Sequence, residues 1–558
     1  MFEVFLDTSE YTDEELSKIF KAIKRKRKFV LLDGDKIIKL DEEASSLYQT
    51  LEDFNINLNK PKERVLVPTY EALKAYAHES NCKIDAYLSN MIEEIKSYKD
   101  FNTQLPEINA TLRDYQVDGF KWLSVLKKYH IGGILADDMG LGKTLEIITL
   151  ISADNTSKPS LIVCPKSLVF NWMNEFKKFN PKLEVSEIYG AASDRESIIT
   201  SIEKDKNHVY VISYDSLSRD IETIKNIDFK FVILDEAQTI KNVNAKKSVN
   251  VKLLRAEYRF ALTGTPIENT VIDLWSLFDF LMPNFLEELS LFKSHYTNDE
   301  NYSKQLAQKV ALFILRRTKS DVLKDLPSKF ERIVTCQMNI SQRKLYDSMI
   351  MDANDKMASG AKAFDILPYL MRLRQICIDP SLYIENSKET GAKLEELYSI
   401  IDEYKASHKM IIFSQFVSAL NIVKAHLEES NISYFMITGD TDAKERLKLA
   451  NEFNNDSTPI FLVSLKAGGT GLNLIGADTV IHIDPWWNSS AENQATDRAH
   501  RIGQKKNVEV IKLICENSIE QRVIELQNMK KDIIDKLIAN DDSNMSKITL
   551  DDLSFILK

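Results

Sequence analysis

The sequence predicts an α/β protein with two parallel-sheet lobes, helical insertions and a small α+β region at the N-terminus. Three observations support this prediction. Short apolar runs alternate with helical patterns through residues 105–285, and the alternation returns through residues 389–520. Strands separated by helices are typical of parallel sheets with crossover helices. The 558 residues also exceed a single core, because one domain usually contains roughly 150 residues.

Residues 1–104 form the first predicted region. Apolar residues alternate around Asp-Gly in "KFVLLDGDKIIKLD" (28–41), which indicates a β-hairpin. The basic run "KAIKRKRKF" (21–29) just before it is typical of a solvated helix face, and we assign it no function.

The rest of the chain divides into four further regions. The first lobe, residues 105–285, contains the apolar runs "GGILA", "SLIVCP", "VYVISY", "FKFVILDEA" and "YRFALTGTP". Residues 286–388 are predicted to be mainly helical, with "QKVALFILRRT" and "YLMRLRQICI" as amphipathic pieces. The second lobe, residues 389–520, contains "KMIIFSQF", "YFMITGD", "PIFLVSL" and "DTVIHIDP". Residues 521–558 are predicted to form a charged helical tail.

The composition is that of a soluble protein, with 44% hydrophobic and 28% charged residues. No apolar run approaches the roughly 18 residues that a membrane span needs, and the start lacks the order of a signal peptide. The cysteines are far apart, without a C-x-x-C pair: Cys82, Cys164, Cys336, Cys377 and Cys515. We therefore expect a cytoplasmic protein without a membrane partner, disulfide framework or zinc site. The net charge of −10 argues only weakly against nucleic acid, because a groove can be basic on an acidic protein.

The segment "DDMGLGKT" (137–144) has the features of a phosphate-binding loop. It follows an apolar strand and ends in Lys143-Thr144 at the start of a helical pattern. Backbone N–H groups at a helix N-terminus bind phosphate, lysine neutralises it, and threonine holds Mg²⁺ through its hydroxyl. The usual first glycine is replaced by Asp137.

Two carboxylates, Asp235 and Glu236, end the buried run of "FKFVILDEAQ". Carboxylates at the mouth of a buried strand are costly unless they bind something positive. We expect Asp235 to support Mg²⁺ and Glu236 to orient and deprotonate the attacking water. The alternative is a strand that simply ends in an acidic turn.

A third candidate element, "ENQATDRAHRIGQ" (492–504), lies in the second lobe. In a helix, Gln494, Arg498 and Arg501 would share one face. Arginines that reach across a cleft stabilise the charge on a transferring phosphoryl group. The alternative is a surface helix with salt bridges.

Together these motifs resemble the superfamily-two helicase-like ATPases, and within them the SWI/SNF family of DNA translocases. The segments "LRDYQ" (112–116), "DEAQ" (235–238), "LTGTPIEN" (262–269), "SLKAGGTGLNL" (464–474) and "QATDRAHRIGQ" (494–504) are similar to family motifs, as is the phosphate loop, whose acidic pair is a family trait. Two segments are more particular to the family: "LRRTKSDVLKDLPSK" (315–329) and "LRQICIDPSLY" (373–383). The resemblance spans residues 105 to about 525 in family order.

The resemblance implies two RecA-like lobes that use ATP and Mg²⁺ to move along double-stranded DNA and to remodel or displace bound proteins. It implies that Lys143, Glu236, Arg498 and Arg501 are catalytic, with Arg501 slightly favoured over Arg498 as the arginine finger, and that Thr144 and Asp235 hold the metal. The implied nucleotide-binding residues are Gln116 (as the adenine contact), Asp137, Met139, Gly140, Leu141, Gly142, Lys143, Thr144 and Gly471.

The resemblance also implies a track of contacts to the DNA backbone, without a base code. The implied residues are Lys166, Ser167, Tyr214, Thr263, Ser414, Gln415, Gly468, Gly469 and Thr470, with Pro165 and Thr265 beside them. Trp486 and Trp487 are available for stacking on DNA, although a tryptophan pair after a strand is more often part of a core.

Some features depart from the family pattern or stay open. Gln238 stands where histidine is frequent, which affects the coupling of hydrolysis to movement, and Ser489 stands where proline is frequent. Residues 1–104 resemble the end of an accessory domain of bacterial members, without an upstream zinc finger, which is compatible with a short or truncated form. We expect a monomeric motor that acts on an unidentified DNA-bound protein, such as RNA polymerase or a nucleoid protein. The alternatives are a strand-separating DNA or RNA helicase and a nucleotide-gated binding protein with negligible turnover.

Overall fold

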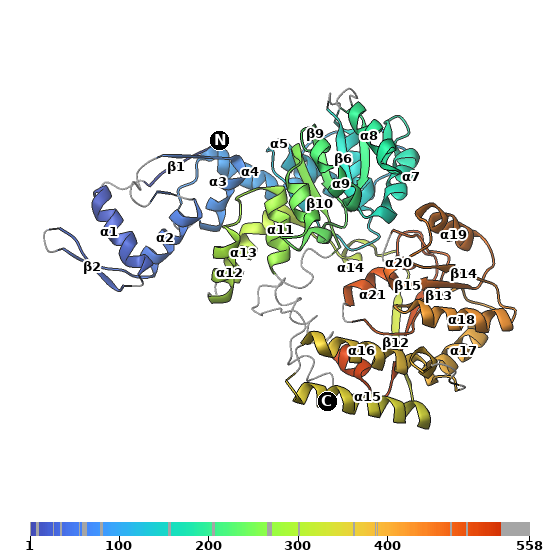
Figure 1. Cartoon of the computed structure of the whole chain (residues 1–558). Coiled ribbons are helices and arrows are strands. Elements are labelled where there is room, and N and C mark those ends of the chain that lie inside the picture. The colour runs from blue at the N-terminus through green and yellow to red at the C-terminus, as the bar shows by residue number, and fades with distance from the viewer. Residues whose placement is uncertain are drawn as a thin grey trace.

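The computed structural model describes residues 2–525 with several gaps (Figure 1). The gaps are residues 7–10, 26, 34–35, 55, 58–63, 79–81, 155–157, 203–206, 265–270, 299–301, 361–362, 385–386, 388, 469–470 and 487–488. Most of the predicted charged tail therefore lies outside the described residues.

The N-terminal region is a small α+β unit. The predicted hairpin is confirmed, because β2 (Phe29–Leu31) and β3 (Ile37–Lys39) pair antiparallel. Helix α1 begins with a capping box between Thr12 and Glu15. The other elements are β1 (Phe2–Val4), α1 (Asp13–Lys24), α2 (Glu42–Asp53), β4 (Val65–Val67), α3 (Thr69–Ala72) and α4 (Ala86–Lys96).

This region shares a continuous apolar core with the first lobe. The buried ammonium of Lys74 donates to the backbone oxygens of Asp53 and Asn284, and Lys309 donates to the Asp53 carboxylate at 2.8 Å. These contacts join α2 to residues more than 200 positions away, so the N-terminal region is anchored on the first lobe.

The first lobe is a seven-stranded parallel sheet in the order β11-β5-β10-β9-β6-β8-β7. Each of the five predicted apolar runs overlaps one of its strands. The strands are β5 (Gly133–Leu135), β6 (Ser160–Cys164), β7 (Val185–Ile188), β8 (Val209–Ser213), β9 (Asp228–Leu234), β10 (Arg255–Leu262) and β11 (Ile314–Leu315). The helices are α5 (Asp114–Lys128), α6 (Lys143–Ser152), α7 (Val169–Phe179), α8 (Ala192–Ser201), α9 (Tyr214–Ile224) and α10 (Lys246–Lys252).

The region between the lobes is mainly helical, as predicted, but it also contributes one strand to each sheet. Strand β11 pairs with β5, and β12 (Lys329–Cys336) pairs with β17 of the second sheet. The expected amphipathic helix through "QKVALFILRRT" ends early, because Ile314 and Leu315 complete the first sheet. The helices of this region are α12 (Leu289–Asn298), α13 (Tyr302–Val310), α14 (Lys319–Val322), α15 (Ile340–Ala358) and α16 (Ala363–Ile378), while α11 (Val271–Leu281) precedes it at the end of the first lobe.

The second lobe is a six-stranded parallel sheet in the order β12-β17-β16-β13-β15-β14. Apolar clusters cover both of its faces. The remaining strands are β13 (Met410–Ser414), β14 (Tyr434–Ile437), β15 (Ile460–Ser464), β16 (Thr479–His482) and β17 (Val508–Cys515). The helices are α17 (Ala392–Tyr404), α18 (Val417–Glu429), α19 (Ala443–Asn455), α20 (Leu465–Gly468) and α21 (Ser489–Thr496).

The two parallel-sheet lobes confirm the predicted fold class, and they contact each other. Helix α19 of the second lobe packs on α7 of the first lobe, where Lys444 lies 4.9 Å from the centre of the Phe170 ring. In Figure 1 the lobes lie next to each other, with α14 between them. Among the described residues, no helix is both long and apolar enough to cross a membrane.

Candidate nucleotide site between the lobes

The phosphate loop connects β5 to α6, which begins at Lys143. Gly140 and Gly142 have φ angles of 87° and 89°, a left-handed conformation that glycine adopts without strain. The Lys143 ammonium reaches back over the loop to the carbonyl oxygens of Asp137 and Asp138, at 2.5 and 3.4 Å. The first N–H groups of α6 have no partner within the helix, so the loop presents the donors and the cation that a phosphate needs.

Gln116 packs against this loop from α5. Its Nε2 donates to the Leu141 carbonyl at 3.0 Å, and its Oε1 accepts from the Arg113 backbone N–H. The hydroxyl of Tyr115 donates to the same Leu141 carbonyl at 2.8 Å. The "LRDYQ" segment therefore supports the phosphate loop directly, and the adenine contact of Gln116 stays a prediction.

The acidic pair follows β9, as expected. The indole Nε1 of Trp172 donates to Asp235 Oδ2, and the Glu236 backbone N–H donates to Oδ1, both at 2.9 Å. Burial raises the pKa of Asp235 to about 6, and the nearby charge of Glu236 adds to this shift. A bound cation would oppose both causes, so the carboxylate environment fits a divalent metal ion.

Glu236 belongs to a short hydrogen-bonded chain. Gln238 Nε2 donates to Glu236 Oε2 at 2.7 Å, and the Thr263 hydroxyl donates to Gln238 Oε1 at 2.8 Å. Glu236 has a φ of 48°, a conformation that is rare for a residue with a side chain. The glutamine that departs from the family pattern therefore joins the "DEAQ" and "LTGTPIEN" segments and fixes the Glu236 carboxylate.

The arginine segment (492–504) reaches the first lobe, but it is not one continuous helix. Helix α21 ends at Thr496, so the expected shared helical face of Gln494, Arg498 and Arg501 is wrong. Turns follow the helix, and they still direct both arginines toward the first lobe. Arg498 Nη2 lies 3.8 Å from the Met139 sulfur.

The arginines are close to the acidic pair and to the loop. Burial lowers the pKa of Arg498, and the carboxylate of Glu236 is the largest opposing influence. Burial and the charge of Arg498 lower the pKa of Arg501 to about 10. A Cβ on Gly140 would stand only 2.7 Å from the Arg501 Cβ, so the loop and Arg501 are in direct contact.

Arg317 is a residue of the site that the sequence argument missed. Its guanidinium bonds the carboxylates of both Asp137 and Glu146, which are fully buried. The Asp137 side chain is thus held by Arg317, and its expected role as a nucleotide contact stays a prediction. The two adjacent arginines in "LRRTKSDV" indicated a charged contact in this segment, but only the fold shows that the Arg317 side chain is buried against the loop.

Several residues that are expected to contact DNA have buried side chains that bind within the protein, and their DNA contacts stay predictions. The Tyr214 hydroxyl donates to the Asp235 carbonyl at 2.9 Å, and the Ser414 hydroxyl donates to Asp484 at 2.6 Å. Thr263 is bonded within the lobe, and Gly468 packs against the Phe413 ring. Polar side chains at strand ends here satisfy neighbouring buried groups, which a pattern in the sequence does not reveal.

Other expected contacts are open or lie outside the described residues. Lys166 is exposed after β6 and Ser167 is half-buried, on the side that meets α19. The half-buried Gln415 accepts from Arg374 at 2.5 Å, and Gly471 is in contact with Leu168 of the first lobe rather than open to a nucleotide. Trp486 packs against the Arg374 guanidinium, as a core residue does. Residues outside the described part are Thr265, Gly469, Thr470 and Trp487.

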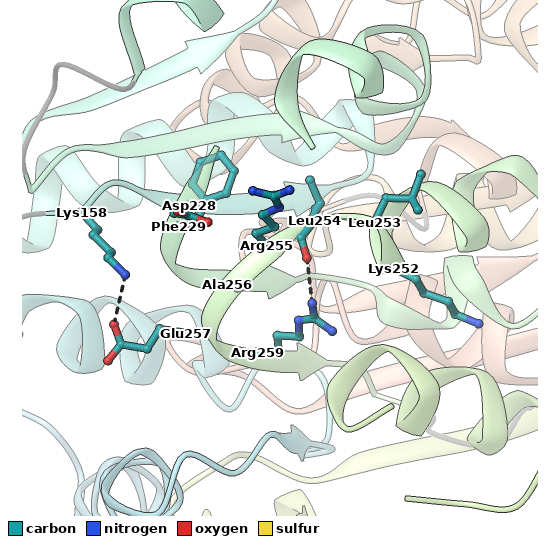
Figure 2. Close-up of a pocket in the computed structure, with 10 residues that line it drawn as sticks. All are labelled: Lys158, Asp228, Phe229, Lys252, Leu253, Leu254, Arg255, Ala256, Glu257 and Arg259. Carbon is teal, nitrogen blue, oxygen red and sulfur yellow. Dashed lines mark hydrogen bonds and ion pairs between the residues drawn. The ribbon is translucent and has the colours of Figure 1, made fainter. Parts of the chain in front are cut away.

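A separate hollow of about 570 Å³ lies at the other end of the first sheet (Figure 2). It is lined where β9 and β10 begin, at Asp228 and Arg255. Arg259 points to the Leu254 carbonyl at 2.7 Å, and Lys158 pairs with Glu257 (Figure 2). Parallel sheets bind ligands at the carboxyl ends of their strands, so this hollow is not the nucleotide site.

The fold also brings together two cysteines that are far apart in sequence. Ligand atoms of Cys377, Cys515 and Glu520 lie within 4.8 Å of one another. The Glu520 carboxylate already receives the Lys393 ammonium at 2.6 Å, and the Cys515 thiol donates to the Cys377 carbonyl at 3.1 Å. The cluster is thus a buried ion pair beside two thiols.

Comparisons with known proteins agree with the motifs. A family model for the SNF2-related domain matches residues 115–382, and one for the helicase conserved C-terminal domain matches residues 392–503. A third, for the bacterial SNF2 helicase associated region, matches residues 1–106.

Individual relatives are similar over most of this chain. An uncharacterized ATP-dependent helicase of Mycoplasma genitalium is 39% identical over 81% of this chain and 46% of its own length. The TATA-binding protein-associated factor MOT1 of Saccharomyces cerevisiae is 32% identical over 83% of this chain and 29% of its own length. A solved SWI2/SNF2 ATPase core of Sulfolobus solfataricus, in complex with double-stranded DNA, is 36% identical over 79% of this chain and 96% of its own, with a TM-score of 0.41.

The chain spans about half the length of the Mycoplasma relative. Its matches nevertheless run in family order from the accessory region through both lobes. The resemblance noted from the motifs is confirmed: the chain belongs to the SNF2 family of helicase-like ATPases.

Proposed function

We propose that this chain is an ATP- and Mg²⁺-dependent motor that moves along double-stranded DNA and displaces or remodels proteins bound to it. One observation carries the proposal. Arg498 of the second lobe lies near the phosphate loop and Glu236 of the first lobe, and Arg501 is in contact with the loop at Gly140. A site assembled from two lobes allows hydrolysis to alter how the lobes are held together.

The side chains have separate roles in this proposal. Lys143 leaves the loop carbonyls and neutralises the β- and γ-phosphates, while the α6 N-terminus donates to them. Thr144, half-buried next to Lys143, and Asp235 hold the metal ion, which polarises the phosphates when bound. Glu236, oriented by Gln238, accepts the proton of the attacking water.

The arginines complete the site from the second lobe. Their positive charge is buried, which costs free energy in the absence of an anion and strengthens the attraction for phosphate. Charge develops on the phosphoryl oxygens during transfer, so Arg498 and Arg501 act mainly on the transition state. We infer that lobe closure and hydrolysis are coupled through these two residues.

The proposals for the DNA track and for the displaced protein rest on the family and on the exposed surface of the first lobe. We infer that the exposed Lys166 meets phosphates, and contacts of that kind give binding that is independent of base sequence. The name of the yeast relative links it to a DNA-binding protein, which supports a DNA-bound protein as the target here. RNA polymerase and nucleoid proteins are both candidates.

The test is the steady-state ATPase rate with duplex DNA, single-stranded DNA and RNA, at low and moderate salt. We expect the largest stimulation by duplex DNA, with a steep fall as salt rises. Greater stimulation by RNA, or a rate that no nucleic acid alters, would contradict the proposal. Displacement of a third strand from a triplex, without separation of a forked duplex, distinguishes a translocase from the strand-separating alternative.

A further inference from the structure

The chain crosses from one lobe to the other in residues 316–328, here called the crossing segment. It leaves the first sheet at β11 and enters the second at β12. The position of this crossing is informative, because β11 lies beside β5, the strand that leads into the phosphate loop. A connection between two lobes need not approach the nucleotide site, yet this one runs along it.

Backbone contacts hold the crossing segment against the first residues of the loop. The Ala136 N–H donates to the Leu315 carbonyl at 2.7 Å, and the Asp138 N–H donates to the Arg317 carbonyl at 3.0 Å. The Lys319 N–H donates to the Asp138 carboxylate at 3.0 Å. The β5–β11 pairing thus continues past the strand ends into the loop.

Arg317 locks this contact with its side chain. Its Nε donates to both Asp137 oxygens at 3.0 Å, and its Nη2 donates to the Glu146 oxygens at 2.9 and 3.0 Å. Its Nη1 donates to the Tyr115 carbonyl. One buried guanidinium thereby joins three parts of the nucleotide site: the loop, helix α6 and the "LRDYQ" segment.

Lys319, two residues further on, reaches the second lobe. Its ammonium donates to the Asp497 carboxylate and to the His500 carbonyl, both at 2.6 Å. These residues flank Arg498 and precede Arg501, so Lys319 holds the turns that carry both arginines. Asp497 and the backbone N–H bond to Asp138 place Lys319 between the two halves of the site.

We propose that the crossing segment couples the phosphate loop to the arginine segment, with Arg317 and Lys319 as positioning residues for ATP hydrolysis. This rests on the proposed function. Arg317 fixes the loop from behind, and Lys319 transmits its position to Arg498 and Arg501. Movement of the loop on nucleotide binding or release would therefore move the arginines through the crossing segment, in addition to the rest of the interface between the lobes.

The proposal also gives a reason for the unusual loop sequence. A glycine at position 137 offers no carboxylate, so it would leave Arg317 with only Glu146 and a carbonyl. Burial and the Asp137 charge raise the pKa of Glu146, while Arg317 lowers it. One arginine therefore serves two buried acids.

The activity test uses Lys319→Met with Lys324→Met as its control. Lys324 is an exposed lysine of the same crossing segment. We expect Lys319→Met to lower kcat by about tenfold while the KM for ATP changes less, because misplaced arginines affect the transition state more than binding. Lys319→Arg should restore most of kcat, and Lys324→Met should match wild type. A kcat within twofold of the control would overturn the proposal, as would a loss confined to KM.

A second measurement does not depend on ATPase activity. Spin labels at Glu196→Cys in α8 and Lys448→Cys in α19, both exposed, report the distance between the lobes in the free protein, in a Cys82→Ser background. We expect one narrow distance distribution in wild type and Lys324→Met, and a broader one in Lys319→Met. An unchanged distribution in Lys319→Met would overturn the coupling even in an active enzyme. If wild type shows no ATPase with any nucleic acid, the proposed function fails, while this measurement still decides whether Lys319 holds the lobes.

Discussion

The first lobe contains two pairs of buried or partly buried carboxylates that differ in how their charge is balanced. Asp137 and Glu146 share the guanidinium of Arg317, within hydrogen-bonding distance of both. Asp235 and Glu236 receive neutral donors from Trp172, a backbone N–H and Gln238, and no ion pair to them is found among the described residues. The first pair has a salt bridge to an arginine, while the second pair has none among the described residues. This difference supports the proposal that the second pair binds a metal ion.

The largest expected effect comes from Glu236→Gln, which removes the proposed base from the pair Asp235–Glu236. Hydrolysis should fall by roughly 100-fold or more, since general-base catalysis supplies about 10²–10⁴-fold. ATP binding should persist, because Lys143 and the loop are intact. Single-turnover rates and the binding of a fluorescent ATP analogue check this. Normal turnover would place the base elsewhere, and loss of binding would indicate a structural role.

Arg317→Met tests the other pair, Asp137–Glu146, by removing the arginine that both carboxylates share. It leaves Asp137 buried without its cation, and removing one partner of a buried ion pair typically costs about 3–5 kcal/mol of stability. Urea unfolding of the first lobe measures the loss. Arg317→Lys keeps the charge but not the forked geometry, so it should fall between wild type and Arg317→Met. A change below about 1 kcal/mol in Arg317→Met, as is typical of exposed pairs, would show that burial of Asp137 does not depend on the Arg317 cation.

The pH dependence sharpens the comparison. Because the pKa of Asp235 is raised in the folded state to about 6, folding favours its protonated form. Without metal, its contribution to stability is therefore fully present at pH values below about 4 and is lost as pH rises through about 6. Asp235→Asn should be more stable than wild type at pH 7 and equal to it near pH 4. Thermal unfolding in EDTA at both pH values measures the difference, and Mg²⁺ should stabilise wild type only. Equal stability of wild type and Asp235→Asn at pH 7 would show that the ionised Asp235 carboxylate does not destabilise the metal-free protein.

The smallest expected effect is that of Gln238→Ala. The variant loses the bond that orients Glu236, and the Thr263 hydroxyl loses its acceptor. A hydrogen bond of this kind contributes about 0.5–1.5 kcal/mol, so kcat should fall up to about tenfold with little change in stability. Gln238→His, which restores the residue frequent in the family, serves as the rescue. If both variants hydrolyse ATP at the wild-type rate, Gln238 does not orient the base.

Local patterns in the sequence were sufficient for much of the fold. Strands such as β9 contain a short apolar run, here Phe231 to Leu234, and parallel sheets bury such runs on both faces. The chemistry at their ends, at Lys143 and at Asp235, follows from the same local reasoning. Strand β11 has only two residues, so the sequence shows no alternation of apolar and polar residues there. Its partner strand β5 lies 180 residues earlier in the chain.

The side-chain partners that the sequence did not reveal have one common physical cause. The resemblance to the family implies DNA contacts for Tyr214, Thr263 and Ser414, and these contacts stay predictions. The structure shows that each satisfies a buried polar group of its own lobe. Arg317 was missed for the same reason, because its partners are distant in sequence. Hydrogen-bond partners of buried groups depend on tertiary contacts, and no local pattern encodes them.

The two ends of the crossing segment differ in how firmly they are fixed, which has a consequence for the proposed motor under load. Strand β12 pairs with β17 at eight positions, whereas β11 pairs with β5 at only two. A pull on the crossing segment would therefore peel the first-lobe end first, were it held by backbone pairing alone. The guanidinium of Arg317 lies at that weaker end and clamps it from the side. In the proposed motor, an obstacle on the DNA would load this contact directly, so we expect the force at which movement stalls to depend on the Arg317 side chain.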